Sequence, residues 1–180
     1  MPAAAVHLPG DIQLSRIADP GGTVIRVLQW LDGTGFSDYE HARVYLGPSA
    51  TDGTGLFAEA MPHGAVTAEH YLDSPDTEWD SGLYVLTQGQ RDATVAAARG
   101  YCDARIGYSW IDYGSLVLKR LGIRLPFVVS YVASTGHMIC SQLAAAARFD
   151  GGAPFWSTWT GDCTPGDIHD LIVAREPAHP

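Results

Sequence analysis

The chain has 180 residues, 46% of them hydrophobic and only 17% charged, and its formal net charge at pH 7 is -9. This length and composition fit a single domain spanning residues 1–180, with a full hydrophobic core. The acidic balance argues against binding to nucleic acid or to anionic membranes, because both need clustered Lys and Arg. The low charged fraction leaves room for an interface with an assembly partner.

No part of the sequence predicts a membrane span or a secretory signal. The longest apolar candidate, Leu125–Ala133, is far shorter than the roughly 20 apolar residues that cross a bilayer. Residues 1–9 lack the positive cluster and the apolar stretch of a signal peptide. We therefore expect a soluble protein, either cytoplasmic or delivered by another route such as a phage particle.

The first half of the chain has mainly the patterns of β-strands. Apolar and polar residues alternate over residues 10–17, which is typical of a strand. Apolar residues at helical spacing then predict a helix over residues 23–31. A stretch rich in Gly, Ser and Thr at 47–55 predicts a turn between two further strands. Strands are expected on either side of that turn and after it, at 41–46, 56–61 and 64–71.

The second half of the chain mixes helices with fewer strands. An acidic loop is expected over residues 74–81. The elements predicted after it are a strand at 82–87, helices at 90–105, 110–121 and 138–148, a loop at 150–165, a turn at 167–171 and a last strand at 171–174. Strands early in the chain, followed by helices, indicate an α+β domain with an antiparallel sheet packed against helices.

Cys140 is the candidate nucleophile. It stands in the first turns of the helix predicted over residues 138–148, ahead of a run of four alanines. Backbone N–H groups at a helix start favour negative charge, and thiolate is the nucleophilic form of cysteine. The alternative is a small buried residue of an apolar helix. Cys102 is expected in the core and Cys163 in an exposed loop, and three cysteines indicate no disulfide framework.

His41 is the candidate base. A cysteine and a distant histidine that the fold brings together form the minimum of a cysteine hydrolase. If the strand at 41–46 folds back onto the strand at 56–61, Glu59 shares the face of His41. A carboxylate beside an imidazole fixes its tautomer and stabilises its charged form. Glu59 is therefore the candidate orienting acid, unless a slip of one residue turns it to the other face, where it would be an ordinary solvated side chain.

Metal chemistry is the rival interpretation of these residue types. His137 and Cys140 have the H-x-x-C spacing of metal ligands, but no second pair with matching spacing accompanies them. His63, Glu69 and His70 do not form the H-E-x-x-H pattern. We therefore expect neither a metal nor a cofactor.

Five short motifs occur in the order of a known family. They are GDI at 10–12, HARVYLG at 41–47, FAEA at 57–60, GYSW at 107–110 and ICSQL at 139–143. The ordered set resembles the circularly permuted NlpC-type papain-like cysteine hydrolases, the YiiX-like group, in which the histidine strand precedes the cysteine helix. The resemblance extends over about residues 10–171 and implies a papain-like topology.

The resemblance also implies roles for individual residues. His41 matches the family's histidine, Cys140 its nucleophile and Glu59 the acidic residue on the next strand. Tyr108 matches a tyrosine shortly before the cysteine helix, a candidate for oxyanion stabilisation. The family often has Glu after its Cys-Ser pair, where this chain has Gln142, a departure that removes a charge and leaves the nucleophile in place.

Residues and resemblance together predict a cysteine hydrolase that cleaves an amide, in a peptide, an isopeptide or a cell-wall peptide, through an acyl-enzyme. A lipid acyl-ester hydrolase or acyltransferase with the same site stays open, with Phe155, Trp156 and Trp159 as candidates for an apolar groove. A non-catalytic binding or structural module, for example of a phage particle, is the third possibility.

Overall fold

The computed structural model describes residues 6–17, 38–107, 138–157 and 163–175. Its elements are β1 (Ile12–Ser15), β2 (His41–Pro48), β3 (Thr54–Met61), β4 (Gly64–Tyr71), β5 (Thr77–Trp79), α2 (Gln88–Asp103), α5 (Cys140–Asp150) and α6 (Pro165–Val173). The described part is α+β, as predicted, with one open antiparallel sheet of five strands and three helices. The helices predicted at 23–31 and 110–121 lie outside the described residues.

The sheet has the order β4-β3-β2-β1-β5, and every neighbouring pair is antiparallel. In the β2–β3 pair Val44 lies opposite Ala58 and Tyr45 opposite Phe57. A register shift follows between Tyr45 and Gly47, so the first half of β2 keeps a regular register against β3. Continuing that register places Arg43 opposite Glu59, with His41 two positions further along the same face.

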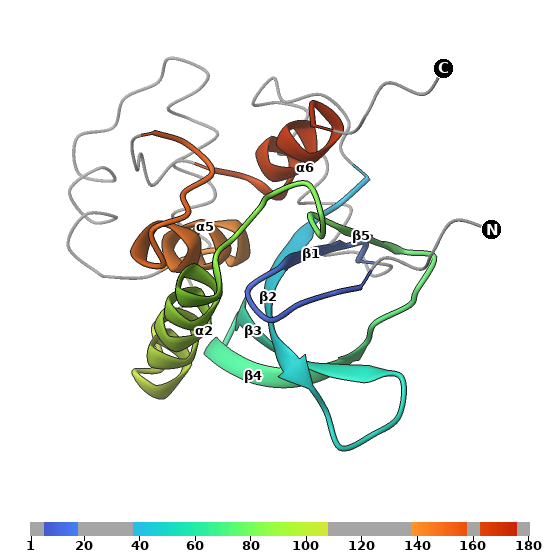
Figure 1. Ribbon diagram of the computed structural model, residues 1–180. Coiled ribbons are helices and arrows are strands. Elements are labelled where there is room, and N and C mark those ends of the chain that lie inside the picture. Colours follow the sequence, from blue (N-terminus) through green and yellow to red (C-terminus); the bar gives the residue numbers. More distant parts are fainter. Residues whose placement is uncertain (1–5, 18–37, 108–137, 158–162, 176–180) are drawn as a thin grey trace, which may run out of the picture.

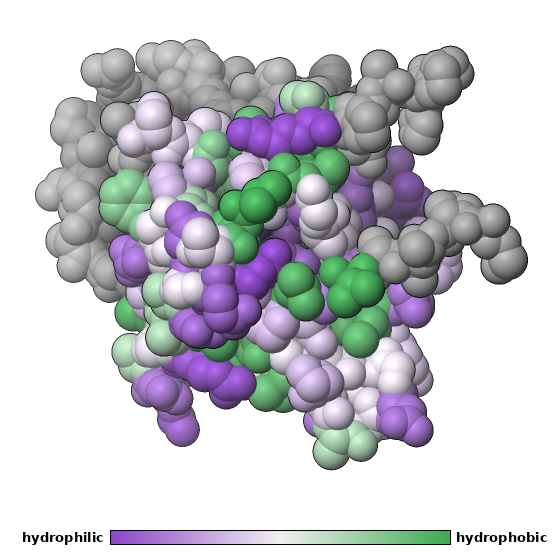
Figure 2. All heavy atoms as spheres, in the orientation of Figure 1, coloured by the Kyte–Doolittle hydropathy of each residue, from purple (hydrophilic) through white to green (hydrophobic). Residues whose placement is uncertain are grey.

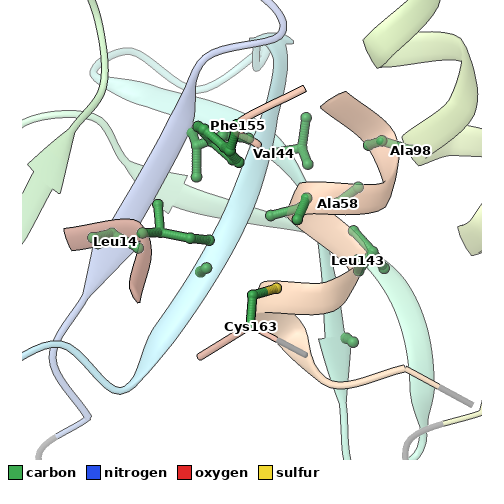
Figure 3. Close-up of a cluster of buried hydrophobic side chains, with 14 of the residues drawn as sticks. Leu14, Val44, Ala58, Ala98, Leu143, Phe155 and Cys163 are labelled. Carbon is green, nitrogen blue, oxygen red and sulfur yellow. The ribbon is translucent and has the colours of Figure 1, made fainter. Parts of the chain in front are cut away.

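One face of the sheet packs against α2 and α5, which also pack against each other (Figure 1). Ile12, Leu14 and Val44 point to this side and are completely buried. They belong to one buried cluster with Leu143 of α5 and Ala98 of α2, part of which is labelled in Figure 3. The run of alanines in α5 leaves little side-chain bulk between helix and strands, which lets the helix approach the sheet closely. The start of α5 is thereby held against the strands.

The opposite face of the sheet is built from aromatic and polar side chains. The Phe57 ring lies 5.4 Å from that of Tyr45 and 5.8 Å from that of Trp79, measured between ring centroids. The chain between β4 and β5 crosses this face, because Gln13 and Trp79 both donate hydrogen bonds to the Leu72 carbonyl. Burial on both faces explains why the odd-numbered residues of β1 and β2 are as inaccessible as the even-numbered ones.

The strand predicted at 82–87 is wrong. Leu83 N donates to the Asp80 carbonyl in a turn. Thr87 is the N-cap of α2, and its hydroxyl accepts a hydrogen bond from Gln90 N at 3.2 Å. The fifth strand is β5, inside the predicted acidic loop. The three residues of β5 are all half-buried, so they show no alternation of apolar and polar side chains. β5 is a strand because it pairs with β1.

The strand predicted at 171–174 is also wrong, because these residues lie at the end of α6. The Thr164 hydroxyl accepts from Asp167 N, and the Asp167 carboxylate accepts from Thr164 N, so each side chain satisfies a backbone donor of the other. Pro165 begins the helix, where it has no N–H to leave unsatisfied. Cys163, predicted to be exposed, is 2% exposed at this helix start.

The helices predicted at 90–105 and 138–148 correspond to α2 and α5, each displaced by two residues. No helix in the described ranges is long and apolar enough to cross a bilayer. On the face shown in Figure 2, hydrophobic side chains of the described residues gather in small groups between hydrophilic ones.

Candidate active site

Cys140 is the first residue of α5 and is 1% exposed. The N-cap is Ile139, whose side chain has no hydrogen-bond acceptor. An α-helix gives no internal partner to the N–H groups of its first turn. The Gln142 side chain instead accepts from Ile139 N at 2.9 Å, closing the helix start without a negative charge. The Cys140 sulfur therefore lies at the positive end of a helix that no acidic side chain neutralises in its first turn.

Two contacts fix the start of α5 in the fold. The Cys140 Sγ lies 3.9 Å from the backbone carbonyl of Glu40, the residue before β2. The next residue, Ser141, donates a hydrogen bond of 2.7 Å to the Cys163 carbonyl. Both contacts are buried and span long distances in sequence, so the tertiary fold, and not the local chain, fixes the position of the sulfur.

His41 begins β2 and is 8% exposed. Its Nε2 lies 2.7 Å from Oε2 of Glu59, on the neighbouring strand β3. The Cys140 side chain also acts on His41, because charge and hydrogen bonding between the two side chains raise the pKa of the imidazole. Since an imidazole has two ring nitrogens and Nε2 is engaged with Glu59, Nδ1 is the nitrogen left for the sulfur. The Glu59 carboxylate thus contacts the imidazole directly, and the Cys140 sulfur acts on the same ring.

The contacts of His41 decide its protonation. Burial opposes a charge on His41, but the charge of the Cys140 sulfur, the hydrogen bond between the two side chains and the Glu59 carboxylate outweigh it. Together they raise the pKa of His41 from its ordinary 6.5 to about 9. The imidazolium is therefore the main form at neutral pH.

Glu59 stays ionised although it is only 3% exposed. Burial opposes the carboxylate, but hydrogen bonds from His41 and His70 and their charges outweigh this effect and hold the pKa of Glu59 well below its usual range. The second donor, His70 Nε2, lies 2.9 Å from Oε1. The two oxygens of Glu59 are thus each taken by one imidazole, which fixes the plane of the carboxylate.

His70 and Arg43 are the members of this cluster that sequence reasoning missed. His70 was weighed only as a metal ligand, and in the β3–β4 register it lies opposite Gly55, four positions from Glu59. The strong curvature of the sheet, visible in Figure 1, and two long side chains bring the groups together. Arg43 lies opposite Glu59 by continuation of the β2–β3 register and interacts with its charge. Alternation along β2 could have identified Arg43, because residues 41 and 43 of one strand point to the same face of the sheet.

The predicted trio of Cys140, His41 and Glu59 therefore lies together in the structure. Tyr108 and His137 lie outside the described residues. No group of three His, Cys, Asp or Glu side chains in the described ranges could hold a metal ion. Comparison with models of protein families, with curated proteins and with solved structures found no match for this chain.

Proposed function

We propose that this protein is a cysteine hydrolase that cleaves an amide bond, with a permuted papain-like topology. The observation that carries the proposal is the grouping of Cys140, His41 and Glu59, which come from segments up to about a hundred residues apart in the sequence. A helix start, a raised histidine pKa and a buried carboxylate are together the means by which cysteine enzymes generate a thiolate. The order of the sequence motifs supports the same assignment.

The first chemical step follows from the positions of these groups. The Cys140 thiolate attacks the carbonyl carbon of the scissile amide, and a carbon–sulfur bond forms while the carbonyl electron pair moves to oxygen. First-turn backbone N–H groups of α5 are suited to stabilise that oxyanion, because the helix leaves them without internal partners. Tyr108 is a further candidate for this role, from the resemblance alone.

His41 supplies the proton for the second part of the reaction. Its imidazolium protonates the leaving amine as the carbon–nitrogen bond breaks, which gives a thioester on Cys140. The neutral imidazole then removes a proton from water, and the resulting hydroxide cleaves the thioester to release the acid and regenerate the thiolate–imidazolium pair. Glu59 keeps the ring oriented and stabilises its charge throughout.

A peptide or isopeptide amide, including a cell-wall peptide, is the substrate class that we favour over a lipid acyl ester. An acyl-ester hydrolase needs an apolar groove beside the nucleophile. Phe155, a candidate for that groove, is only 6% exposed and packs on Tyr84 and Arg148 in the core. This contact leaves Phe155 unavailable to an acyl chain in the described conformation.

Substitution of the nucleophile tests the proposal directly. We expect C140A to lose at least about a thousandfold of the hydrolysis rate and to keep its fold, because the covalent step has no other nucleophile. Hydrolysis of a peptidoglycan stem peptide and of a short acyl ester should be measured in parallel, with circular dichroism as the folding check. C102A is the matched control and should keep full activity. Full activity of C140A on either substrate would refute the assignment.

A non-catalytic binding module is the second candidate, and the burial of Cys140 favours it, since a nucleophile must be reached by its substrate. Thiol labelling near neutral pH separates the two candidates. Exposure alone predicts that half-buried Cys102 reacts before Cys140 and Cys163, which are 1% and 2% exposed. Burial also raises the pKa of the Cys102 thiol. The hydrolase predicts that Cys140 reacts fastest, whereas labelling of Cys102 first, or equal slow labelling of all three, would support the binding module.

A further inference from the structure

A polar cavity of about 220 Å³ lies on the aromatic face of the sheet, beside the cluster around Glu59. Ser15 of β1, Arg43 of β2 and His70 of β4 line it from the strands, and Thr77 of β5 lines it from the other edge. Arg16 and Asp76, both exposed, line its rim together with Tyr71 and Ser74. The cavity thus has a buried polar floor and a rim that includes charged residues.

Arg43 is the unusual residue of this floor. It is 6% exposed, and its Nε donates no hydrogen bond to any described residue. No carboxylate of the described residues lies within ion-pair distance of its guanidinium. Glu59 acts on it through charge, but both Glu59 oxygens are already taken by His41 and His70. The ring of Phe57 supports it from one side, 5.3 Å from the guanidinium carbon.

The Arg43 Nε–H is buried without an acceptor among the described residues, and a polar group buried without a hydrogen bond is costly. Two oxygen atoms held in one plane satisfy the guanidinium fork better than any other small group. We propose that the cavity is a binding site for a small oxyanion, a carboxylate or a phosphate group, with Arg43 as its principal cation. The buried Ser15 and the half-buried His70 and Thr77 offer further polar groups around the anion.

The rim limits the charge of the ligand. Arg16 is the second cation, but it is already paired with Asp38 at 3.3 Å. Asp76 adds a negative charge at the entrance. A small ion or an exposed terminal group of one or two negative charges fits this balance better than a polyanion. Because His70 both lines the cavity and bonds Glu59, an anion bound there also acts on the carboxylate that orients His41.

Histidine NMR of the full chain tests the site. Protein labelled at the imidazole Cε1 should be titrated with inorganic phosphate and, separately, with acetate, at an ionic strength held constant with sodium chloride. We expect a saturable shift of the His70 signal, assigned with H70Q, and no shift of His63, which lies outside the cavity. Tighter binding of phosphate identifies a phosphate site, and tighter binding of acetate identifies a carboxylate site.

Variants separate this site from the proposed hydrolase. R43Q should weaken anion binding by about 10- to 100-fold, since it removes a charge-assisted hydrogen-bond pair. R99Q, on the exposed side of α2, is the matched control and should bind as the wild type does. R43K is the second variant, for use if R43Q does not fold. It keeps the positive charge but lacks the paired N–H donors of the guanidinium, so it should also weaken anion binding. C140S should bind the anion normally, whatever its activity.

Two results would overturn the proposal. One is a wild-type protein in which neither anion moves the His70 signal in a saturable way. The other is an unchanged dissociation constant in R43Q or, where only R43K folds, in R43K. Neither result bears on Cys140, and loss of hydrolysis in C140S bears only on the proposed function.

Discussion

Asp80 and Glu59 are both buried carboxylates, with 1% and 3% of their surface exposed, but their surroundings act on them in opposite directions. Asp80 pairs with Arg148, which is itself completely buried, and accepts a hydrogen bond of 2.7 Å from Ile12 N. Burial outweighs these contacts and raises the pKa of Asp80 to about 6. For Glu59 the two imidazoles outweigh burial, and the pKa is lowered.

The difference lies in the partners. Arg148 cannot release its proton, so the Asp80 pair is a fixed link between the last turns of α5 and the sheet. His41 can release its proton, so the Glu59 cluster at the other end of the same helix can take part in chemistry. One helix therefore joins a structural ion pair at its C-terminal end to the cluster that we propose to be reactive at its N-terminal end. We expect the first to govern stability and the second to govern reactivity.

The largest effect expected is on stability. D80N should lower the free energy of unfolding by about 3–5 kcal/mol, because Arg148 stays charged in the core without its counter-ion. E59Q should cost only about 1–2 kcal/mol, since the amide oxygen still accepts one imidazole hydrogen bond. Urea denaturation at pH 7 measures both. The double variant D80L/R148M removes both charges and should recover most of the loss. Equal costs for D80N and E59Q would contradict the comparison.

The reactivity of Cys140 should depend more on the Glu59 cluster than on the Asp80–Arg148 pair, the reverse of the order expected for stability. E59Q should lower the alkylation rate of Cys140 at pH 7.5 by about 10- to 100-fold, because the imidazolium that stabilises the thiolate loses its carboxylate. D80L/R148M keeps the Glu59 cluster and should react within about threefold of the wild type. The rates follow from mass spectrometry of iodoacetamide-treated protein. A fast E59Q protein would remove Glu59 from the mechanism.

The sequence predicted the part of this site that depends on regular patterns. Cys140 was placed at a helix start by the apolar run after it, and Glu59 beside His41 by strand alternation and a turn of known length. His70 was missed because four positions of register separate it from Glu59, and alternation carries no information on sheet curvature. The pattern of a single strand likewise cannot show that both faces of the sheet are covered.

The structural ion pair could not be predicted from sequence patterns. Arg148 ends an alanine-rich helix as an ordinary solvated residue would, and Asp80 stands in an acidic stretch. Only the packing of α5 on the sheet buries both. The missed strand β5 has the same cause, since it ends one residue before Asp80 and is defined by its partner β1. Features that depend on one tertiary contact leave little trace in local sequence.

The pH dependence of labelling sharpens the assignment of His41. The imidazolium attracts an anionic reagent, so the rate ratio of iodoacetate to iodoacetamide at Cys140 should fall as pH rises through about 9, the pKa of His41. The raised pKa also stabilises the fold below pH 6.5, and that stability is lost as pH rises through 9. E59Q should move the midpoint of the ratio down by about one pH unit. The same rate ratio at Cys102 is the internal control. A ratio at Cys140 that does not change with pH would show that the charge of His41 does not act on Cys140.

The smallest effect expected is that of His70, which acts only through Glu59. The lowered pKa of Glu59 contributes stability that is present above its ordinary value of 4.5 and is lost as pH falls through the lowered value. H70A removes one of the two donors, so the pKa of Glu59 should rise and the loss should begin at a higher pH. The free energy of unfolding at pH 4 should fall below that of the wild type by up to about 1 kcal/mol, beyond any difference at pH 7.

A matched variant separates the hydrogen bond of His70 from its packing. H70Q keeps an N–H donor, so its unfolding free energy between pH 7 and 4 should follow the wild type more closely than that of H70A. If H70A and H70Q lose the same stability at every pH, the ring of His70 supports Phe57, which it contacts edge-on at 5.7 Å, and the carboxylate does not depend on it. A pH-dependent gap between the two variants would instead assign to His70 the task of keeping Glu59 ionised, which is what distinguishes this carboxylate from Asp80.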